Sequence, residues 1–288
     1  MTILRPRKSL GQNFLVDPLH QARIVAAADL VPDDAVLEIG AGDGFLTALI
    51  AAQAGRVVAV ELDERLIAVL RRRFSAQAHV LVLHGDILEM DIAEVMRTGV
   101  GDVQDSSLDA DAGTRFKVVA NLPYYITGAV IRKLIESEAP PALSVLTIQR
   151  EVAERIVADP PHMSLLAVSV QFYCFGEIVD RIPASAFRPS PRVESATVRL
   201  LRRAEPMFPG LQVEDFFKVT RAGFCQPRKQ LRNSLALGMG VSPNVATAWL
   251  QAAGISPQRR AETLTLEDWR RLTEAVTRES DEVLAARH

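Results

Sequence analysis

The chain has 288 residues, of which 48% are hydrophobic, and its formal net charge is −2. This length is enough for one large or two modest domains with a well-developed core. The near-neutral charge excludes a global basic field, so any nucleic-acid binding has to come from local basic patches. The two cysteines, Cys174 and Cys225, form no metal-ligand spacing and are typical of a reducing cytosol.

The hydropathy of the chain carries no membrane signal. Residues 1–8 lack the apolar core of a signal peptide, and no apolar run is long enough to span a bilayer. There is no heptad pattern either. We therefore expect a cytoplasmic protein without membrane contact, which acts as a monomer and holds no metal.

Short apolar runs alternate with helical patterns over the first 150 residues. Asp17-Pro18 predicts the start of a helix that reaches about Asp29. Five strands are predicted at 35–39, 56–60, 79–83, 117–120 and 143–148, with further helices at 45–54, 63–74 and 127–138. This alternation predicts an α/β domain with a mostly parallel sheet that helices cover on both faces.

Two segments interrupt or end this pattern. Between Thr98 and Arg115 an acidic, glycine-containing stretch predicts a solvated loop insertion. Further on, Pro206, Pro209 and Gly210 predict a linker. Helical patterns without strands follow at 213–222, 229–237, 244–253 and 266–277. The sequence therefore predicts a catalytic domain over residues 1–203 and a small all-α domain over residues 204–288.

Glycines and carboxylates follow three successive predicted strands. The first strand runs into Gly40-Ala41-Gly42-Asp43-Gly44, where the backbone can approach a ligand closely. The second ends at Glu61, 21 positions after Gly40, where a carboxylate can accept from both hydroxyls of a ribose. The third ends beside Asp86, which can accept from an adenine amino group. Because ligands of open α/β sheets bind outside the carboxyl ends of the strands, these groups predict a nucleoside site.

The fourth strand ends in Asn121-Leu122-Pro123-Tyr124. The Asn121 amide and the Leu122 carbonyl are neutral acceptors for an exocyclic amine, and Tyr124 offers a ring to stack on. Pro123 stiffens the turn. The glycine loop lacks the Gly-x-Gly-x-x-Gly spacing that binds a pyrophosphate. A nucleoside cofactor without diphosphate, next to a grip for an amine, indicates S-adenosylmethionine rather than a nicotinamide.

Five motifs resemble the ribosomal RNA adenine N6-dimethyltransferase family over nearly the whole chain. They are Gly11-Gln12-Asn13-Phe14-Leu15, the glycine loop from Glu38 to Gly44, Asn121-Leu122-Pro123-Tyr124, Phe187-Arg188-Pro189-Ser190-Pro191-Arg192-Val193, and the segment from Phe224 to Leu235. The last of these is most similar to the bacterial small-subunit branch. Ser9, Leu10 and Ala41 depart from the family pattern.

The resemblance implies a class I S-adenosylmethionine-dependent methyltransferase fold with a small all-α C-terminal domain. The catalytic domain would be Rossmann-like, with a mostly parallel seven-stranded sheet and an antiparallel last strand near 197–201. The residues implied to hold S-adenosylmethionine are Asn13, Leu15, Gly40, Glu61, Asp86 and Asn121. The substrate implied is a pair of adjacent adenosines near the 3′ end of 16S rRNA in the small ribosomal subunit, each dimethylated at N6.

Four residues are expected to act on the target base: Asn121, Leu122, Tyr124 and Phe187. Adenine N6 is a poor nucleophile because its lone pair is delocalised into the ring. Two acceptors that hold the amine hydrogens can turn that lone pair toward the methyl group. Tyr124 and Phe187 are expected to stack on the base. No histidine is required, because the methylated ammonium is acidic and loses its proton readily.

RNA binding is expected from the C-terminal helices. The basic residues there are Arg221, Arg228, Lys229 and Arg232. Side chains of this kind position RNA through its phosphates and make the affinity salt-dependent. A basic helix face is often simply solvated, but the neighbouring motifs favour RNA contact here.

Three alternatives remain open on the sequence. Within the same class, the chain could methylate one adenosine of 23S rRNA, as macrolide-resistance enzymes do. It could be mainly a ribosome-assembly factor without an essential catalytic role. It could also methylate adenine in duplex DNA. The long C-terminal segment favours the small-subunit enzyme.

Overall fold

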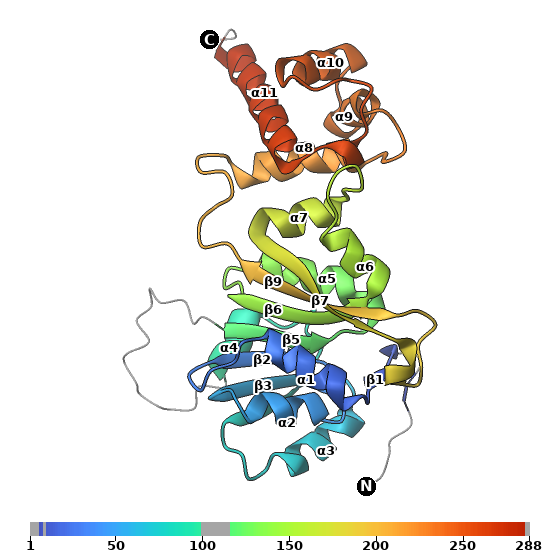
Figure 1. The fold of residues 1–288 in the computed structure, drawn as a ribbon. Helices are drawn as coiled ribbons and strands as arrows, with labels where there is room; N and C mark the ends of the chain where they lie inside the picture. Colours follow the sequence, from blue (N-terminus) through green and yellow to red (C-terminus); the bar gives the residue numbers. More distant parts are fainter. Residues whose placement is uncertain (1–5, 8–9, 99–115, 286–288) are drawn as a thin grey trace. The chain divides into compact units, whose positions relative to one another are not determined.

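The computed structural model describes residues 6–7, 10–98 and 116–285, with side chains described to Glu279 (Figure 1). The acidic stretch predicted to be a loop insertion falls mainly on residues 99–115, outside the described residues. The chain divides into two compact units. One comprises Met1–Glu154 and Cys174–Arg202, and the other comprises Arg155–Tyr173 and Arg203–His288.

A seven-stranded sheet forms the centre of the first unit (Figure 1). Its strands are β2 (Ala35–Ile39), β3 (Arg56–Glu61), β4 (Val80–His84), β5 (Phe116–Asn121), β6 (Leu143–Gln149), β7 (Cys174–Ile182) and β9 (Ser195–Arg202). They are ordered β4-β3-β2-β5-β6-β9-β7. The pairs from β4 to β6 are parallel, whereas β9 is antiparallel to β6 and β7. The predicted methyltransferase sheet, with its antiparallel last strand, is confirmed.

Helices cover both faces of this sheet. They are α1 (Pro18–Ala27), α2 (Phe45–Ala51), α3 (Glu64–Arg73), α4 (Ile92–Thr98) and α5 (Thr127–Ile135). Helices α1 and α2 share a core with Val57 and Val119 of the sheet, while α5 lies on the opposite face with Leu146. The predicted cap at Asp17 is confirmed, since its side chain accepts from the Leu19 amide. Predicted helices 45–54 and 127–138 end three residues earlier than expected.

A two-stranded ribbon lies outside the large sheet. It pairs β1 (Phe14–Leu15) with β8 (Phe187–Arg188), so that Leu15 lies opposite Phe187. This short antiparallel pairing brings the N-terminal motif to the proline-rich loop, two segments more than 170 residues apart in the sequence. It was not predicted, because two-residue strands leave no periodic pattern.

The second unit is helical. It contains α7 (Leu165–Tyr173), α8 (Val213–Phe224), α9 (Leu231–Met239), α10 (Pro243–Ala252) and α11 (Leu266–Ala285), while α6 (Arg150–Ile156) runs across the boundary between the units. Its core includes Phe172, Phe216 and Trp269. The predicted helix at 266–277 is confirmed but continues to Ala285. No helix in the described part of the chain is long and apolar enough to cross a membrane.

Candidate active site

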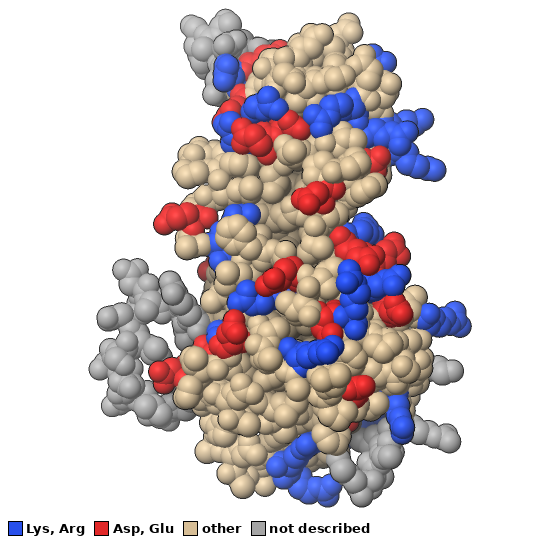
Figure 2. Space-filling view, in the orientation of Figure 1, with Lys and Arg blue, Asp and Glu red and all other residues tan. Residues whose placement is uncertain are grey.

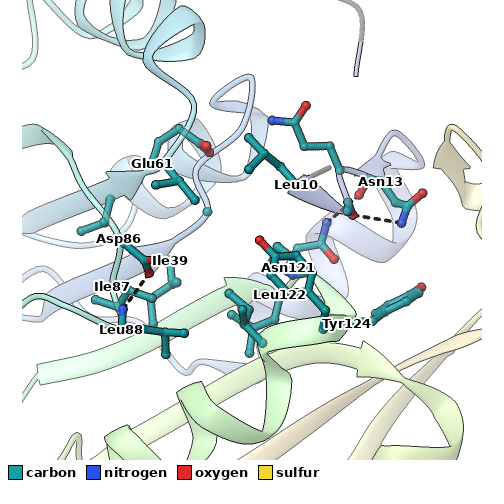
Figure 3. Close-up of a pocket in the computed structure, with 18 of the residues that line it drawn as sticks. Leu10, Asn13, Ile39, Glu61, Asp86, Ile87, Leu88, Asn121, Leu122 and Tyr124 are labelled. Atoms are coloured by element: carbon teal, nitrogen blue, oxygen red, sulfur yellow. Dashed lines mark hydrogen bonds between the residues drawn. The ribbon is translucent and has the colours of Figure 1, made fainter. Parts of the chain in front are cut away.

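A cavity of about 190 Å³ opens at the carboxyl ends of the parallel strands in the first unit. Figure 3 shows Glu61 and Asp86 on one side of it and Asn121, Leu122 and Tyr124 on the other. Leu10 and Asn13 reach it from the N-terminal segment. The edge of the sheet where the sequence predicted a site is therefore the edge that carries the cavity.

The glycine loop follows β2 in a conformation that side chains disfavour. Gly40 and Gly42 have φ values of 76° and 59°, in the left-handed region that glycine adopts most readily. A Cβ built on Gly42 would lie 3.2 Å from the Phe14 ring. Gly40 lines the cavity. The glycines thus let the loop turn tightly beneath the N-terminal segment.

The Glu61 carboxylate is fixed by the backbone on both of its oxygens. Oε2 accepts from the Gly42 amide at 2.8 Å, and Oε1 accepts from the Asp63 amide at 2.8 Å. Burial raises the pKa of Glu61 above its usual range. Each oxygen keeps a second lone pair that can accept from a ligand hydroxyl. Glu61 therefore both shapes the glycine loop and offers two acceptors to the cavity.

Asp86 follows β4 and is held in a similar way. Its Oδ1 accepts from the Leu88 amide at 2.9 Å, which leaves Oδ2 for a ligand. Ile39, Ile87 and Leu88 form the apolar wall beside it (Figure 3). An apolar wall next to a carboxylate suits an aromatic heterocycle with an amino group.

The Asn121 amide is oriented by the N-terminal segment. Its Nδ2 donates to the Asn13 carbonyl at 3.1 Å. A carbonyl can only accept, so this contact fixes which end of the amide is the NH₂ group. Among the described residues no group donates to Oδ1, so this oxygen is free to accept from a ligand.

Leu122 offers a second acceptor beside Asn121. Its amide donates to the Thr147 carbonyl of β6 at 3.0 Å, which fixes the peptide as it leaves β5. Within the described part of the chain its own carbonyl accepts no hydrogen bond. Pro123 follows with φ −56° and begins the short 3-10 helix η2 (Tyr124–Ile126). Two neutral acceptors therefore lie next to each other at one end of the cavity.

Tyr124 is anchored from the antiparallel strand β9. Its hydroxyl lies 2.7 Å from the Ser195 hydroxyl, and burial raises the pKa of the Tyr124 phenol. Phe187 also lines the cavity, but it is only 2% exposed and belongs to the core around α1. Ser195 is fully buried and was missed by the sequence reasoning. Its only signal was its place two residues after the proline-rich motif.

Five of the six predicted cofactor residues line the cavity: Asn13, Gly40, Glu61, Asp86 and Asn121. Leu15 does not. It belongs to β1, where it is buried in the core around α1 and its carbonyl accepts from Gln21 at 2.6 Å. Its neighbour Phe14 lines the cavity, and both residues border a separate hollow of about 30 Å³.

Glu38 is a buried acid that the sequence reasoning did not assign to the site. It lies in β2 below the glycine loop, and it is 1% exposed. Burial raises the pKa of Glu38 to about 8. Its Oε2 has no hydrogen-bond partner among the described residues. A carboxyl in this setting stays protonated at neutral pH.

The N-terminal segment is held over the cavity by Asp63. Gln12 lines the cavity, and its Nε2 donates to Asp63 Oδ2 at 3.0 Å. Arg7 lies 3.5 Å from Asp63 Oδ1. Hydrogen bonds from Arg65 lower the pKa of Asp63 below its usual range. Residues 10–14 are therefore joined to the tip of β3 as well as to Asn121.

The four basic residues predicted to bind RNA lie in the helical unit. Arg221 is in the last turn of α8, Arg228 and Lys229 are in the loop before α9, and Arg232 is in α9. The first three are exposed, and Arg232 is half-buried. Among the described residues none of the four forms an ion pair. Figure 2 shows basic side chains gathered over the α9 side of this unit. No group of metal-ligating side chains occurs in the described residues.

Comparison with known proteins places the chain in a family. The family model described as ribosomal RNA adenine dimethylase matches residues 3–278. The protein named ribosomal RNA small subunit methyltransferase A from Dehalococcoides mccartyi is 44% identical over 269 residues, which cover 93% of this chain and 88% of that protein. Its namesake from Lysinibacillus sphaericus is 37% identical over 278 residues, covering 94% and 90%.

Solved structures agree with this fold. The 23S rRNA methyltransferase ErmE superposes with a TM-score of 0.69 at 29% identity, covering 92% of this chain and all of that chain. A dimethyladenosine transferase from Plasmodium falciparum gives a TM-score of 0.74 at 22% identity, covering 93% and 98%. The chain belongs to the ribosomal RNA adenine dimethylase family, and it is an S-adenosylmethionine-dependent enzyme that dimethylates adenine in ribosomal RNA.

Proposed function

We propose that the enzyme transfers methyl groups from S-adenosylmethionine to N6 of two adjacent adenosines near the 3′ end of 16S rRNA in the small ribosomal subunit. The observation that carries this proposal is the pair of neutral acceptors, Asn121 Oδ1 and the Leu122 carbonyl, which accept from no described residue and lie at one end of the cavity that Glu61 and Asp86 also line. Each adenosine would become dimethylated, and the product would be a modified small subunit. We also infer a role in small-subunit biogenesis.

The donor set of the cavity fits S-adenosylmethionine. Glu61 would accept from the ribose hydroxyls, Asp86 from the adenine amine, and the glycine loop at Gly40 would lie against the sugar. Asn13 and Asn121 would border the methionine part of the cofactor. Leu15 would only support the N-terminal segment from the core, because it does not line the cavity. When bound, the cofactor supplies an electrophilic methyl group on a positively charged sulfur.

The target adenine would be activated by position. Asn121 Oδ1 and the Leu122 carbonyl would each accept one N6 hydrogen and turn the nitrogen lone pair toward the cofactor side. A neutral amide accepts without pairing with the positively charged sulfur. Positioning of this kind can supply roughly 7–11 kcal/mol of the barrier reduction. After transfer the ammonium proton would leave to water, so the site requires no strong base.

Stacking would compensate for moving the adenine out of its own stack, which costs a few kcal/mol. The hydroxyl of Tyr124 is held by its hydrogen bond with Ser195, and the Tyr124 ring would stack on the base. Phe187 would close the cavity from the core side. Each aromatic contact contributes about 1–3 kcal/mol.

The two domains would divide the work. We propose that residues 1–203 bind the cofactor and carry out the reaction, and that the helical residues 204–288 contact rRNA. Arg221, Arg228 and Lys229 are exposed and free of acidic partners among the described residues, as phosphate-binding side chains should be. The protein would act in the cytoplasm as a monomer, without membrane contact.

The relatives favour the small subunit over 23S rRNA as the substrate. Proteins named for the small subunit are 37–44% identical to the chain, whereas the 23S methyltransferase ErmE is 29% identical. Expression in a macrolide-sensitive strain separates the two, because only a 23S enzyme should confer resistance. Duplex DNA should accept no methyl groups.

The decisive experiment uses labelled S-adenosylmethionine and small subunits from a strain that lacks these methyl groups. Mapping of the modified nucleosides should find dimethyladenosine at two adjacent positions near the 16S 3′ end. Transfer to 23S rRNA instead would contradict the proposed substrate. Cofactor binding without any transfer, together with normal subunit assembly by an Asn121→Ala variant, would favour a purely assembly-related role.

A further inference from the structure

Tyr125 lies at the mouth of the cavity and remains largely open to solvent. It lines the cavity together with Tyr124, yet 61% of its surface is exposed. No other aromatic side chain of the described residues is so exposed. An exposed aromatic ring beside a ligand cavity offers a face on which a nucleobase can stack. Catalysis as described above makes no use of this ring.

The Tyr125 ring lies against the N-terminal segment at Gly11. The residue belongs to the 3-10 helix η2, so its backbone is ordered by the Asn121–Tyr124 turn. Gly11, with φ 59°, lies against it: a Cβ built there would be 3.1 Å from Cδ1 of Tyr125. The N-terminal segment thus supports the ring while leaving the rest of it accessible.

The cavity offers a single pair of neutral acceptors for a target base, Asn121 Oδ1 and the Leu122 carbonyl. Glu61 and Asp86, on the other side, are the groups assigned to the cofactor, so one adenine takes the remaining end. When one adenosine of a pair enters it, the neighbouring nucleotide has to stay outside, within one backbone step of the mouth. The ring found at that mouth is Tyr125.

We propose that Tyr125 is a second stacking platform, which binds the base of the nucleotide next to the target adenosine. This inference rests on the proposed function, since the neighbour would be the other adenosine of the pair. Tyr124 and Tyr125 then bind two consecutive bases, one inside the cavity and one at its mouth. Consecutive aromatic residues on one short helix thereby select an unstacked dinucleotide rather than a single flipped base.

The test uses 2-aminopurine, whose fluorescence is quenched by stacking and which has no N6 amine to methylate. A synthetic 3′ fragment with 2-aminopurine in place of either adenosine is ligated into 16S rRNA and assembled into small subunits. The protein is added with S-adenosylhomocysteine. The variants are Tyr125→Phe, which keeps the ring, and Tyr125→Leu, which keeps apolar bulk against Gly11 but removes the π-face.

The adenosine that remains enters the cavity, because only it carries an N6 amine, and the 2-aminopurine then lies at the mouth. We expect quenching of this probe with the wild type and Tyr125→Phe, and loss of the quenching with Tyr125→Leu. The KM of Tyr125→Leu for unmodified subunits should rise about 5- to 150-fold, while the Kd for S-adenosylmethionine stays unchanged. Unchanged quenching and KM in Tyr125→Leu would overturn the proposal. A matched loss of cofactor affinity would also overturn it, because the ring would then serve only to hold the N-terminal segment.

Methyl transfer by the wild type to normal subunits is measured alongside. If transfer occurs and Tyr125→Leu behaves as the wild type, the second platform is wrong and the proposed function stands. If the wild type modifies neither adenosine, the proposed function fails, and the dinucleotide platform fails with it.

Discussion

The two ends of the cavity are held in place by different means. At the cofactor end, backbone amides of the adjoining loops fix the Glu61 and Asp86 carboxylates. At the base end, the groups depend on distant segments: Asn121 on the Asn13 carbonyl, and Tyr124 on Ser195 of β9. The carboxylates of the first end are fixed by the loops that follow their own parallel strands, whereas the Asn121 and Tyr124 side chains of the second end are fixed by the N-terminal segment and the antiparallel strand.

This difference separates binding from reaction. Groups fixed by their own loops should keep their geometry when the rest of the site changes. Side chains that are held by residues far away in the sequence should lose their orientation when one of those residues is replaced. Changes at the cofactor end should therefore appear mainly in cofactor affinity, and changes at the base end mainly in the rate of transfer.

Replacement of the reactive amide should give the largest effect. Asn121→Ala removes an acceptor that acts on the reacting amine, and loss of one such preorganised group typically costs about 10²- to 10³-fold in kcat. Single-turnover transfer to small subunits measures the rate, and calorimetry measures cofactor affinity, which should change by less than about tenfold. Asn13→Ala is the matched control: it keeps the backbone carbonyl that orients Asn121. If the rate at saturating cofactor fell equally in Asn121→Ala and Asn13→Ala, the proposed separation of a cofactor end from a base end would be wrong.

Loss of the ribose acceptor Glu61 should weaken cofactor binding and leave the rate of transfer nearly unchanged. Glu61→Ala removes two charge-assisted hydrogen bonds, each worth about 1.5–3 kcal/mol, so the Kd for S-adenosylmethionine should rise at least about tenfold. The kcat at saturating cofactor should stay within a few-fold of the wild type. Glu61→Gln keeps one acceptor, so its cofactor affinity should lie between those of the wild type and Glu61→Ala. An intact Kd with a lowered kcat would contradict this assignment.

Glu38 should make stability fall as the pH rises. Its pKa is about 8 in the folded protein against 4.5 in the unfolded chain, so between these values the unfolded chain has lost a proton that the folded protein keeps. This contribution to the free energy of unfolding is complete below pH 4.5 and decreases by about 1.4 kcal/mol per pH unit up to about 8. Urea unfolding at several pH values in this range gives the free energy of unfolding of the wild type and of Glu38→Gln. Only the wild type should show this additional decrease with pH. Parallel pH profiles would show that Glu38 ionises normally.

The Tyr124–Ser195 hydrogen bond should give the smallest effect. Ser195→Ala and Tyr124→Phe should each lower kcat a few-fold without changing cofactor affinity. The double variant should be no worse than either single one, with a coupling energy of about 0.5–1.5 kcal/mol. Ser195→Thr keeps the hydroxyl and should rescue the rate. Strictly additive losses would mean that the two hydroxyls act independently.

Sequence patterns located the ligand-facing groups at both ends of the cavity, but not the contacts that hold the base end in place. Strand tips are predictable because apolar runs end at defined residues, and Gly40, Glu61 and Asp86 line the cavity as expected. Support from far along the chain leaves no local pattern, so Ser195 and the β1–β8 pairing were missed. Strand β7 was also not located, because it is an edge strand with a bulge between Ile178 and Asp180 that breaks the alternation.

Residues 10–14 border the cavity and also carry the carbonyl that orients Asn121. Moving this segment aside to release spent cofactor would break the Asn121–Asn13 hydrogen bond, and the amide could then rotate. If an adenosine entered the cavity while no cofactor was bound, the orientation of its acceptor, Asn121 Oδ1, would not be fixed. By the proposed function, two adenosines would each take two methyl groups, which would require several cofactor exchanges. Each round would then begin with the enclosure of fresh cofactor, before the Asn121 amide could bind the next amine.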